Sequence, residues 1–351
     1  MFFGKNDHLV GLDIGSKVVK AGEIIASKKG FSLKKFGMLQ LSPGTIEEGA
    51  IKDPENAAAC IRELFQMHRI KSRNVAISIG GYSVIVKNIV TQSMSEDDLQ
   101  DTIHIEAEQY IPFDINDVNL DFLILGEADT SPNQMNVLLI AVKKEIVSDY
   151  VNLIKLAGLN PCIIDVDAFA LQNIYEINYD VRSQNVALID IGASKTSLNI
   201  LKAGNSAFIR DVSLGCSQIN HRIMSETGCD FLQAEKIKLG QPTDTISAEN
   251  IKAIEADAVS GWCAEIRRAL DFFYSNYPDD AIGQVILSGG GANIPSFRET
   301  LSTQTSIEVT TIDPFQRILK NDDKNDTDYL SEVAPQAAIC LGLALRRVND
   351  K

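Results

Sequence analysis

The sequence predicts an α/β fold with two similar lobes, the first of which carries an inserted α+β piece. Short apolar strands alternate with helices along most of the 351 residues, which is the pattern of sheets that helices cover. One strand–turn–strand segment also occurs twice, as "GLDIGSKVVK" and, half a chain length later, as "LIDIGASKTS". An internal repeat on that scale predicts two lobes that face one another.

Composition and charge limit the class of protein. With 45% hydrophobic residues at this length, each lobe can bury its own core. The net charge of −14, from 33 basic and 47 acidic residues, disfavours nucleic acids and anionic membrane surfaces as partners. The six cysteines show no C-x-x-C spacing, so we expect small buried side chains in a reducing compartment. No apolar stretch is long enough for a membrane span, so we expect a cytoplasmic protein that reaches a membrane through partners.

The first lobe is expected over residues 1–183. A strand that ends in Asp13 turns at Gly15 into a second strand, and "FSLKKFGMLQL" reads as a third. Asp53 followed by Pro54 predicts a helix start, because Asp caps a helix and Pro fits its first position. The strands "NVAISIGG" and "PCIIDVD" and the helix "AFALQNIYEI" complete this lobe.

The inserted α+β piece is expected near residues 89–160. Ser95 and Asp98 predict a capping box before the helix "LQDTIHIEAEQYI". The strands "VNLDFLIL" and "MNVLLIAV" then form a hairpin, and a helix from Lys144 to Leu156 follows.

The second lobe is expected over residues 184–351. It begins with the repeated turn at Asp190 and contains several long helices. The strand in "QVILSGGGANIPSF" runs into three glycines, after which Pro295 begins a helix. The last helix, "APQAAICLGLALRR", is apolar enough to pack across a core.

The two Asp-Ile-Gly turns are candidate phosphate sites. A carboxylate at the end of a strand, as at Asp13 and Asp190, can orient the water shell of Mg²⁺. The glycine two residues later allows a sharp turn whose N–H groups converge on phosphate oxygens. Lys20 can then neutralise phosphate charge. One such turn alone is better explained as a surface hairpin, but two copies favour a two-sided phosphate site.

Two further motifs become candidate parts of the site once the two Asp-Ile-Gly turns are considered together. The glycine run at 289–291 allows a flat group such as an adenosine to lie against the backbone. The alternative is a flexible turn, but a turn rarely needs three glycines directly after a buried strand. Glu235 and Lys238 are a helical i, i+3 pair, which alone indicates a surface ion pair.

The order of these segments resembles that of the actin-like ATPase superfamily. The stretch "IHIEAEQYIPFDINDVNLDFLIL" is similar to the signature of the type IV pilus assembly protein PilM family, which is related to the division protein FtsA. The resemblance implies an actin-like two-lobe fold of duplicated ribonuclease-H-like domains. It also implies an FtsA-type subdomain at about 89–160 and an adenosine-binding subdomain at about 216–300. The P-loop motif G-x-x-x-x-G-K-[ST] is absent from the sequence.

The resemblance also implies a set of site residues. ATP and Mg²⁺ would lie between the lobes, with Asp13 and Asp190 facing the metal through water. Asp167 matches the position that orients the hydrolytic water, and a helix N-cap is an equal alternative. The nucleotide contacts would come from Gly15, Ser16, Lys17, Lys20, Gly192, Ala193, Ser194 and Thr196 at the phosphates, from Glu235 and Lys238 at the ribose and base, and from Gly289, Gly290 and Gly291 at the adenosine.

The implied function is assembly at the inner membrane. PilM-like proteins bind the cytoplasmic amino-terminal tail of PilN in a groove between the first lobe and the inserted subdomain, and connect it to pilus motor ATPases and platform proteins. We expect ATP binding with at most slow hydrolysis, and self-association into an oligomer or ring stays open. Two alternatives are a small-molecule kinase of sugar or acetate type, which needs a second substrate pocket, and an FtsA-like filament protein. The latter predicts an amphipathic helix after "LGLALRRVNDK", where the sequence ends.

Overall fold

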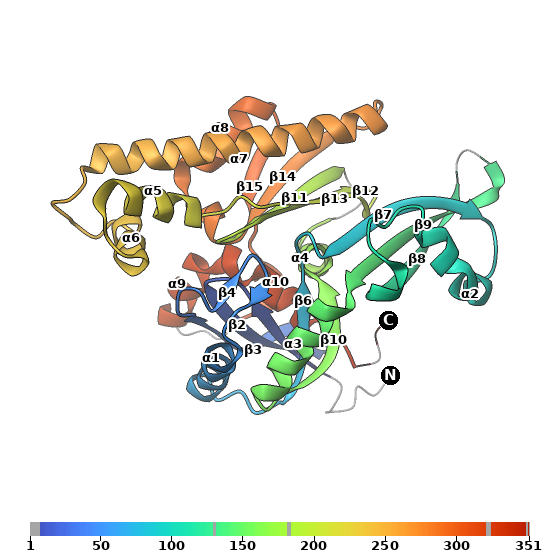
Figure 1. The fold of residues 1–351 in the computed structure, drawn as a ribbon, viewed down its shortest axis with the longest axis horizontal. Helices are drawn as coiled ribbons and strands as arrows, with labels where there is room; N and C mark the ends of the chain where they lie inside the picture. The colour runs from blue at the N-terminus through green and yellow to red at the C-terminus, as the bar shows by residue number, and fades with distance from the viewer. Residues whose placement is uncertain (1–7, 129–130, 181–183, 321–323, 349, 351) are drawn as a thin grey trace.

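The computed structural model describes residues 8–128, 131–180, 184–320, 324–348 and 350. Two lobes lie against one another, and a smaller three-stranded piece projects from the first lobe (Figure 1). The expected boundary between the lobes, at residue 183, falls at 181–183, outside the described residues.

The first lobe is built on a six-stranded sheet with the strand order β10-β6-β1-β2-β3-β16. The strands β1, β2 and β3 form an antiparallel meander, and β6 and β10 run parallel to β1. The strands of this lobe are β1 (Val10–Ile14), β2 (Val18–Ser27), β3 (Gly30–Gln40), β6 (Asn74–Ile79), β10 (Asn160–Val166) and β16 (Ile318–Leu319), with a small separate pair, β4 (Ile46–Glu47) and β5 (Ala50–Ile51).

The second lobe repeats this topology. Its five-stranded sheet has the order β13-β12-β11-β14-β15, again a meander whose first strand is joined by two parallel strands. The strands are β11 (Asn185–Ile191), β12 (Thr196–Lys202), β13 (Asn205–Val212), β14 (Ile282–Ser288) and β15 (Glu308–Thr311). Asp13 pairs across the meander with Lys20, and Asp190 pairs with Ser197 at the equivalent register. The duplicated lobes predicted from the repeat are therefore confirmed.

Helices cover both sheets. In the first lobe α1 (Pro54–Met67) and α3 (Lys144–Leu156) pack on one face of the sheet. The start of α1 is as predicted, because the Asp53 carboxylate accepts a hydrogen bond from the Asn56 N–H. The second lobe carries α5 (Ser217–Thr227), α6 (Phe231–Lys238), α7 (Ala248–Asn276), α8 (Pro295–Thr305) and α9 (Lys324–Glu332), together with the short η2 (Gly290–Asn293).

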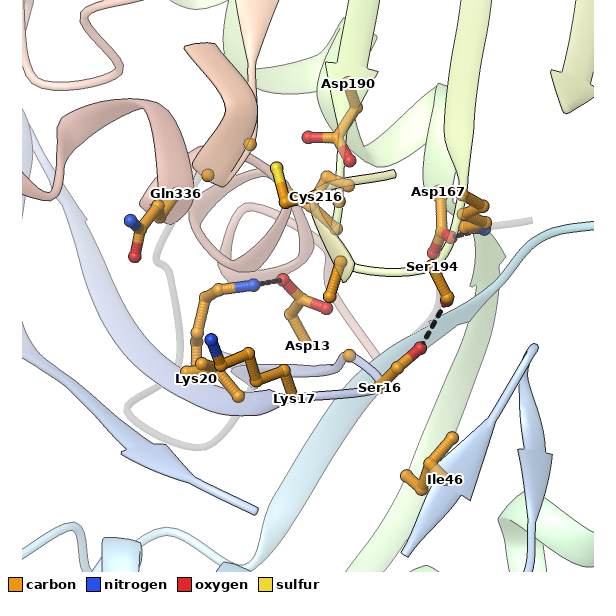
Figure 2. Close-up of a pocket in the computed structure, with 18 of the residues that line it drawn as sticks. Asp13, Ser16, Lys17, Lys20, Ile46, Asp167, Asp190, Ser194, Cys216 and Gln336 are labelled. Carbon is orange, nitrogen blue, oxygen red and sulfur yellow. Dashed lines mark hydrogen bonds and ion pairs between the residues drawn. The ribbon is translucent and has the colours of Figure 1, made fainter. Parts of the chain in front are cut away.

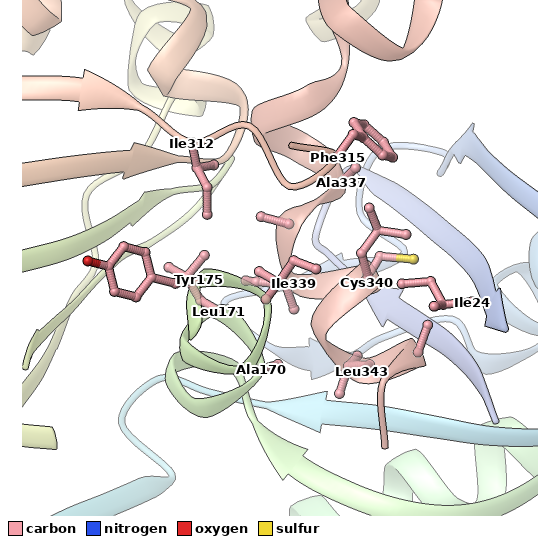
Figure 3. Packing of buried hydrophobic residues seen from close by; sticks show 14 of the residues in the cluster. Ile24, Ala170, Leu171, Tyr175, Ile312, Phe315, Ala337, Ile339, Cys340 and Leu343 are labelled. Carbon is pink, nitrogen blue, oxygen red and sulfur yellow. The ribbon is translucent and has the colours of Figure 1, made fainter. Parts of the chain in front are cut away.

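Two helices between the sheets join the lobes. Figure 3 shows α4 (Asp167–Asn178) and α10 (Ala334–Ala344) crossing within a core that takes side chains from both sheets. The crossing is close because Gly342 faces the backbone of α4: a Cβ added there would lie 1.8 Å from the Ala170 carbonyl oxygen. The apolar last helix therefore packs across a core, as the sequence predicts.

The inserted piece has its own sheet and its own core. The sheet has the order β7-β9-β8 and is covered by one helix, whose Leu99 and Ile103 are buried against Val137 and Leu139. Its elements are β7 (Val84–Gln92), α2 (Glu96–Ala107), η1 (Ile115–Asp117), β8 (Val118–Ala128) and β9 (Ser131–Lys143). Ser95 caps α2 through the Asp98 N–H, as predicted.

The insertion lies nearer the amino terminus than the expected 89–160. Its sheet begins at Val84 and ends at Lys143. The helix α3 instead buries Leu153 and Ile154 in the core of the first lobe. The apolar face of that helix was visible in the sequence, but not which of the two sheets it covers.

Among the described residues, none of the helices combines the length and the apolar character that crossing a bilayer requires.

Candidate functional site

A cavity of about 740 Å³ opens between the lobes, and both Asp-Ile-Gly turns line it. Figure 2 shows Asp13, Ser16 and Lys20 of the first turn facing Asp190 and Ser194 of the second. Both carboxylates lie at the ends of equivalent strands, so the repeat seen in the sequence becomes a two-sided site.

The carboxylate of Asp13 is held by the lysine opposite it in the meander. Lys20 Nζ lies 2.6 Å from Asp13 Oδ2. Burial would lower the pKa of Lys20, but the charge of Asp13 and this hydrogen bond outweigh burial, and the pKa is raised. The first turn therefore presents a neutralised acid–base pair to the cavity.

The carboxylate of Asp190 has no lysine directly paired with it among the described residues, in contrast to that of Asp13. It accepts a hydrogen bond of 2.9 Å from the Ser288 hydroxyl at the end of β14. Burial raises its pKa to about 6, with a further contribution from Asp13, although Lys20 and the serine bond act in the other direction. A divalent cation beside Asp190 would favour its ionised form.

Polar contacts across the cavity join the two lobes. The hydroxyls of Ser16 and Ser194 lie 2.6 Å apart. Lys17 forms an ion pair with Glu235 of α6, and Lys238 Nζ lies 2.7 Å from the same Glu235 oxygen. Burial would raise the pKa of Glu235, but the hydrogen bonds from these lysines lower it to about 2. Glu235 and Lys238 therefore belong to the cavity wall, together with the first turn.

Asp167 does not cap its helix. It is the first residue of α4, Val166 occupies the N-cap position, and no side chain caps this end. The Asp167 carboxylate instead forms an ion pair with Lys195. The N-cap alternative is wrong because the lysine of the second turn takes this carboxylate.

Lys195 and Asp211 are site residues that the sequence interpretation missed. Lys195 Nζ lies 3.9 Å from Asp211 Oδ2 at the end of β13, and the Gly81 N–H donates to the same carboxylate oxygen. The available signal for Lys195 was its place inside the second turn, directly after Ser194. Nothing in the spacing of the sequence connected Asp211 with that turn.

Two predicted residues lie outside the cavity. Thr196 is 2% exposed and its hydroxyl donates to the Leu214 carbonyl oxygen. Gly291 is buried, and a Cβ added there would lie 2.4 Å from Ile191 Cγ2. Thr196 and Gly291 thus serve packing. The other predicted residues line the cavity: Gly15, Ser16, Lys17, Lys20, Gly192, Ala193, Ser194, Glu235, Lys238, Gly289 and Gly290, with Asp13, Asp167 and Asp190.

The cavity fits a nucleotide with Mg²⁺. Its volume is in the range of ligand pockets, and both glycine turns and four lysine side chains (Lys17, Lys20, Lys195 and Lys238) line it. In the described part of the chain, no three His, Cys, Asp or Glu side chains form a direct metal-ligand cluster. The pair of carboxylates, Asp13 and Asp190, would suit Mg²⁺ bound through water, because this ion keeps several of its waters.

The duplicated lobes and the cleft between them define an actin-like fold. The structure of MreB 5 of Spiroplasma citri bound to AMPPNP has a similar fold, with a TM-score of 0.55 and 13% identity over 97% of this chain and 95% of that one. The family model described as type IV pilus assembly protein PilM matches residues 11–348, and the chain belongs to this family. It is thus a type IV pilus assembly protein, and the kinase alternative is set aside.

Two further relatives agree with this assignment. A chain of the structure described as "PilM-PilN type IV pilus biogenesis complex" matches with a TM-score of 0.86 and 26% identity, over 98% of this chain and 99% of that one. The cell division protein FtsA of Bacillus subtilis (strain 168) is 23% identical over 256 residues. That match covers 66% of this chain and 58% of the length of FtsA.

Proposed function

We propose that the chain is a nucleotide-dependent scaffold of the type IV pilus inner-membrane platform. It binds ATP with Mg²⁺ in the cleft between the lobes and the cytoplasmic amino-terminal tail of PilN in a second groove. The observation that supports the proposal is the pair of adjoining cavities, the cleft between the lobes and a second groove. The chain that contains them matches a chain of a PilM–PilN complex with a TM-score of 0.86.

In the cleft, Asp13 and Asp190 would hold Mg²⁺ through water, and a bound Mg²⁺ would supply positive charge at the phosphates. The two turns and their lysines contact the phosphates, while Gly289 and Gly290 lie along the adenosine. Glu235 accepts hydrogen bonds from its neighbours at one oxygen, Oε2, which leaves Oε1 for the ribose. Asp167, whose carboxylate is paired with Lys195 in the structure, is proposed to orient the hydrolytic water, and we propose hydrolysis that is slow at most.

The second groove has a volume of about 400 Å³ and is mostly apolar. Strand β7 lies at the edge of the inserted sheet, and β13 lies at the edge of the second-lobe sheet. The two strands contact each other where Asn88 Nδ2 donates to the carbonyls of Ser206 and Ala207. Beyond this contact, residues 84–86 and 209–211 both line the groove.

Such a groove suits an extended peptide. Edge strands offer unpaired backbone groups to an added chain, and apolar pockets accept its side chains. Pro112 and Phe113 of the inserted piece and Val166 and Ala168 of the first lobe add apolar surface. The groove thus lies where the insertion, the first lobe and strand β13 of the second lobe meet, and we propose it as the site of the PilN tail.

Further partners follow from this role. Capture of the PilN tail would keep an acidic chain with a net charge of −14 at the inner membrane through a protein. From there it would connect PilN to the motor ATPases and platform proteins, with self-association as an additional possibility.

Binding of a fluorescent PilN-tail peptide, measured by anisotropy, tests the partner. Phe113 lines the groove, so Phe113→Ala should weaken binding by about tenfold or more, as for an aromatic hot spot. Phe272→Ala is the matched control, because Phe272 is 53% exposed and lines neither cavity. Equal binding by both variants, with unchanged melting temperatures, would contradict the proposed groove.

A further inference from the structure

The nucleotide cleft and the second groove share a wall. Five residues line both cavities: Gly80, Gly81, Tyr82, Asp167 and Asp211. Two of the five are carboxylates, and they come from different lobes: Asp167 begins α4 and Asp211 lies in β13. A change at these carboxylates therefore reaches both cavities.

One cation joins this wall to the second phosphate turn. Lys195 follows Ser194, lines the cleft and pairs with Asp167, and its Nζ lies 3.9 Å from Asp211 Oδ2. The side chain is 28% exposed. Burial would lower the pKa of Lys195, but the charges of Asp167 and Asp211 outweigh burial and raise it. The lysine therefore remains charged and available to a phosphate.

One carboxylate of this wall, that of Asp211, has an oxygen without a hydrogen-bond partner. Asp211 Oδ2 accepts a hydrogen bond from the Gly81 N–H, whereas Asp211 Oδ1 is buried without a hydrogen-bond partner. Across the sheet, Asp211 pairs with Ser197, and Ser197 pairs with Asp190. Asp211 is thus at the register position of Asp190, the proposed metal-side carboxylate, two strands further along the sheet.

We propose that Lys195 couples the two cavities, an inference that rests on the proposed function. A terminal phosphate in the cleft competes with Asp167 and Asp211 for the Lys195 ammonium. When the lysine turns to phosphate, the two carboxylates lose their cation. The groove then attracts a positively charged or N–H-rich end of the bound tail more strongly.

Coupling of this kind is reciprocal. If ATP strengthens tail binding by some factor, the tail strengthens ATP binding by the same factor. ADP lacks the terminal phosphate, so it should leave Lys195 with its carboxylates and produce less coupling. The groove would thereby distinguish the two nucleotides without contacting either.

The test is the affinity of the full chain for a fluorescent PilN-tail peptide, measured with and without saturating Mg²⁺·ATP. In the parent chain, ATP should increase the affinity for the peptide by about fivefold or more. In Lys195→Ala, both ligands should still bind at high concentration, but the ratio should fall to about one. Lys195→Arg should restore the ratio because it keeps the charge. Lys202→Ala is the matched control: it removes a lysine–aspartate pair from the far end of β12, outside both cavities, and should keep the parent ratio.

The possible failures are distinguishable. A Lys195→Ala chain that keeps the parent ratio, or a parent chain that binds the tail equally with and without ATP, would overturn the coupling and leave the partner assignment standing. A parent chain that fails to bind the tail under either condition would overturn the proposed function and the coupling together.

Discussion

Ser16 and Ser194, which are 178 residues apart in the sequence, share a hydrogen bond of 2.6 Å between the two Asp-Ile-Gly turns. The bond joins equivalent turns of the duplicated lobes across the cleft (Figure 2). Phosphate oxygens placed between the turns would accept hydrogen bonds from both hydroxyls. A change at this pair should therefore affect both the contact between the lobes and the binding of phosphate.

Replacing Ser16 by Ala should therefore have two effects. Loss of the hydroxyl removes one hydrogen bond between the lobes, which should lower the free energy of unfolding by about 1 kcal/mol. It should also weaken the binding of ATP. Urea unfolding and ATP titration measure the two effects. Ser27→Ala is the control, because Ser27 is exposed, lies outside the cavity and has local hydrogen bonds to the Gly30 carbonyl and from the Lys29 N–H. Equal ATP affinity in the two variants would contradict a phosphate role for Ser16.

The raised pKa of Asp190 predicts a specific pH dependence of stability. With a folded pKa of about 6 against about 3.9 when unfolded, the folded chain binds more protons between these values. The contribution of Asp190 to stability is therefore largest below about pH 4 and is lost as the pH rises through 6.

Asp190→Asn should accordingly stabilise the chain at pH 7, by on the order of 2–3 kcal/mol, and by about half as much at pH 5. Urea unfolding without Mg²⁺ or nucleotide measures both values. Asp280→Asn is the control: the hydrogen bond from Lys202 lowers the pKa of Asp280, so no gain is expected at pH 7. A gain for Asp190→Asn that is the same at both pH values would refute the assignment.

Glu235 should show the opposite behaviour. Its carboxylate is held by Lys17, Lys238 and Asn220, and its lowered pKa, about 2, means that its contribution persists until the pH falls towards 2. Glu235→Gln should therefore destabilise the chain at pH 7 and pH 5 alike, by about 1–3 kcal/mol.

The same unfolding curves provide its control. Glu265 forms an ion pair with Arg268 on the surface of α7, where the arginine is 65% exposed. Glu265→Gln should change the free energy of unfolding by about 0.5 kcal/mol or less. A Glu235→Gln effect as small as this would show that the contact between Lys17 and Glu235 contributes little.

Two neighbouring glycines should respond differently to alanine. Gly289 has φ +80°, and a Cβ there would lie 2.4 Å from the Ile191 carbonyl oxygen. Gly289→Ala should lose about 2–4 kcal/mol of stability. At Gly290 the nearest atom to an added Cβ is Gln336 Nε2, 3.9 Å away, so Gly290→Ala should fold normally.

Thermal melting and ATP titration distinguish the two roles. Gly290→Ala should keep its melting temperature within a few degrees and bind ATP more weakly, because the new methyl group lies at the cavity wall. Normal ATP affinity in this variant would place the adenosine elsewhere.

The repeat made the two-lobe fold and the facing positions of Asp13 and Asp190 predictable. Asp13 and Asp190 belong to one motif that occurs twice. Because the motif ends a strand in both copies, the sequence predicts that both carboxylates lie at the edge of a sheet. Thr196 and Gly291 could not be placed in this way, because one step along a strand or a turn decides whether a side chain faces the cavity or the core.

The remaining site residues depend on tertiary contacts. Lys195 could have been chosen as a phosphate contact, but its pairing with Asp167 and Asp211 joins α4 and β13 to the second turn. The extent of the insertion was missed for a similar reason, since α3 could have covered either sheet.

Calorimetric titration of Mg²⁺·ATP into the chain tests the central claim most directly. The parent chain should bind about one nucleotide per chain, and the double variant Asp13→Asn, Asp190→Asn should bind at least about tenfold more weakly, since it loses both carboxylates that are proposed to face the metal. Asp280→Asn should match the parent. A parent chain that binds no ATP, or a double variant that binds it as tightly as the parent, would contradict a nucleotide site between Asp13 and Asp190.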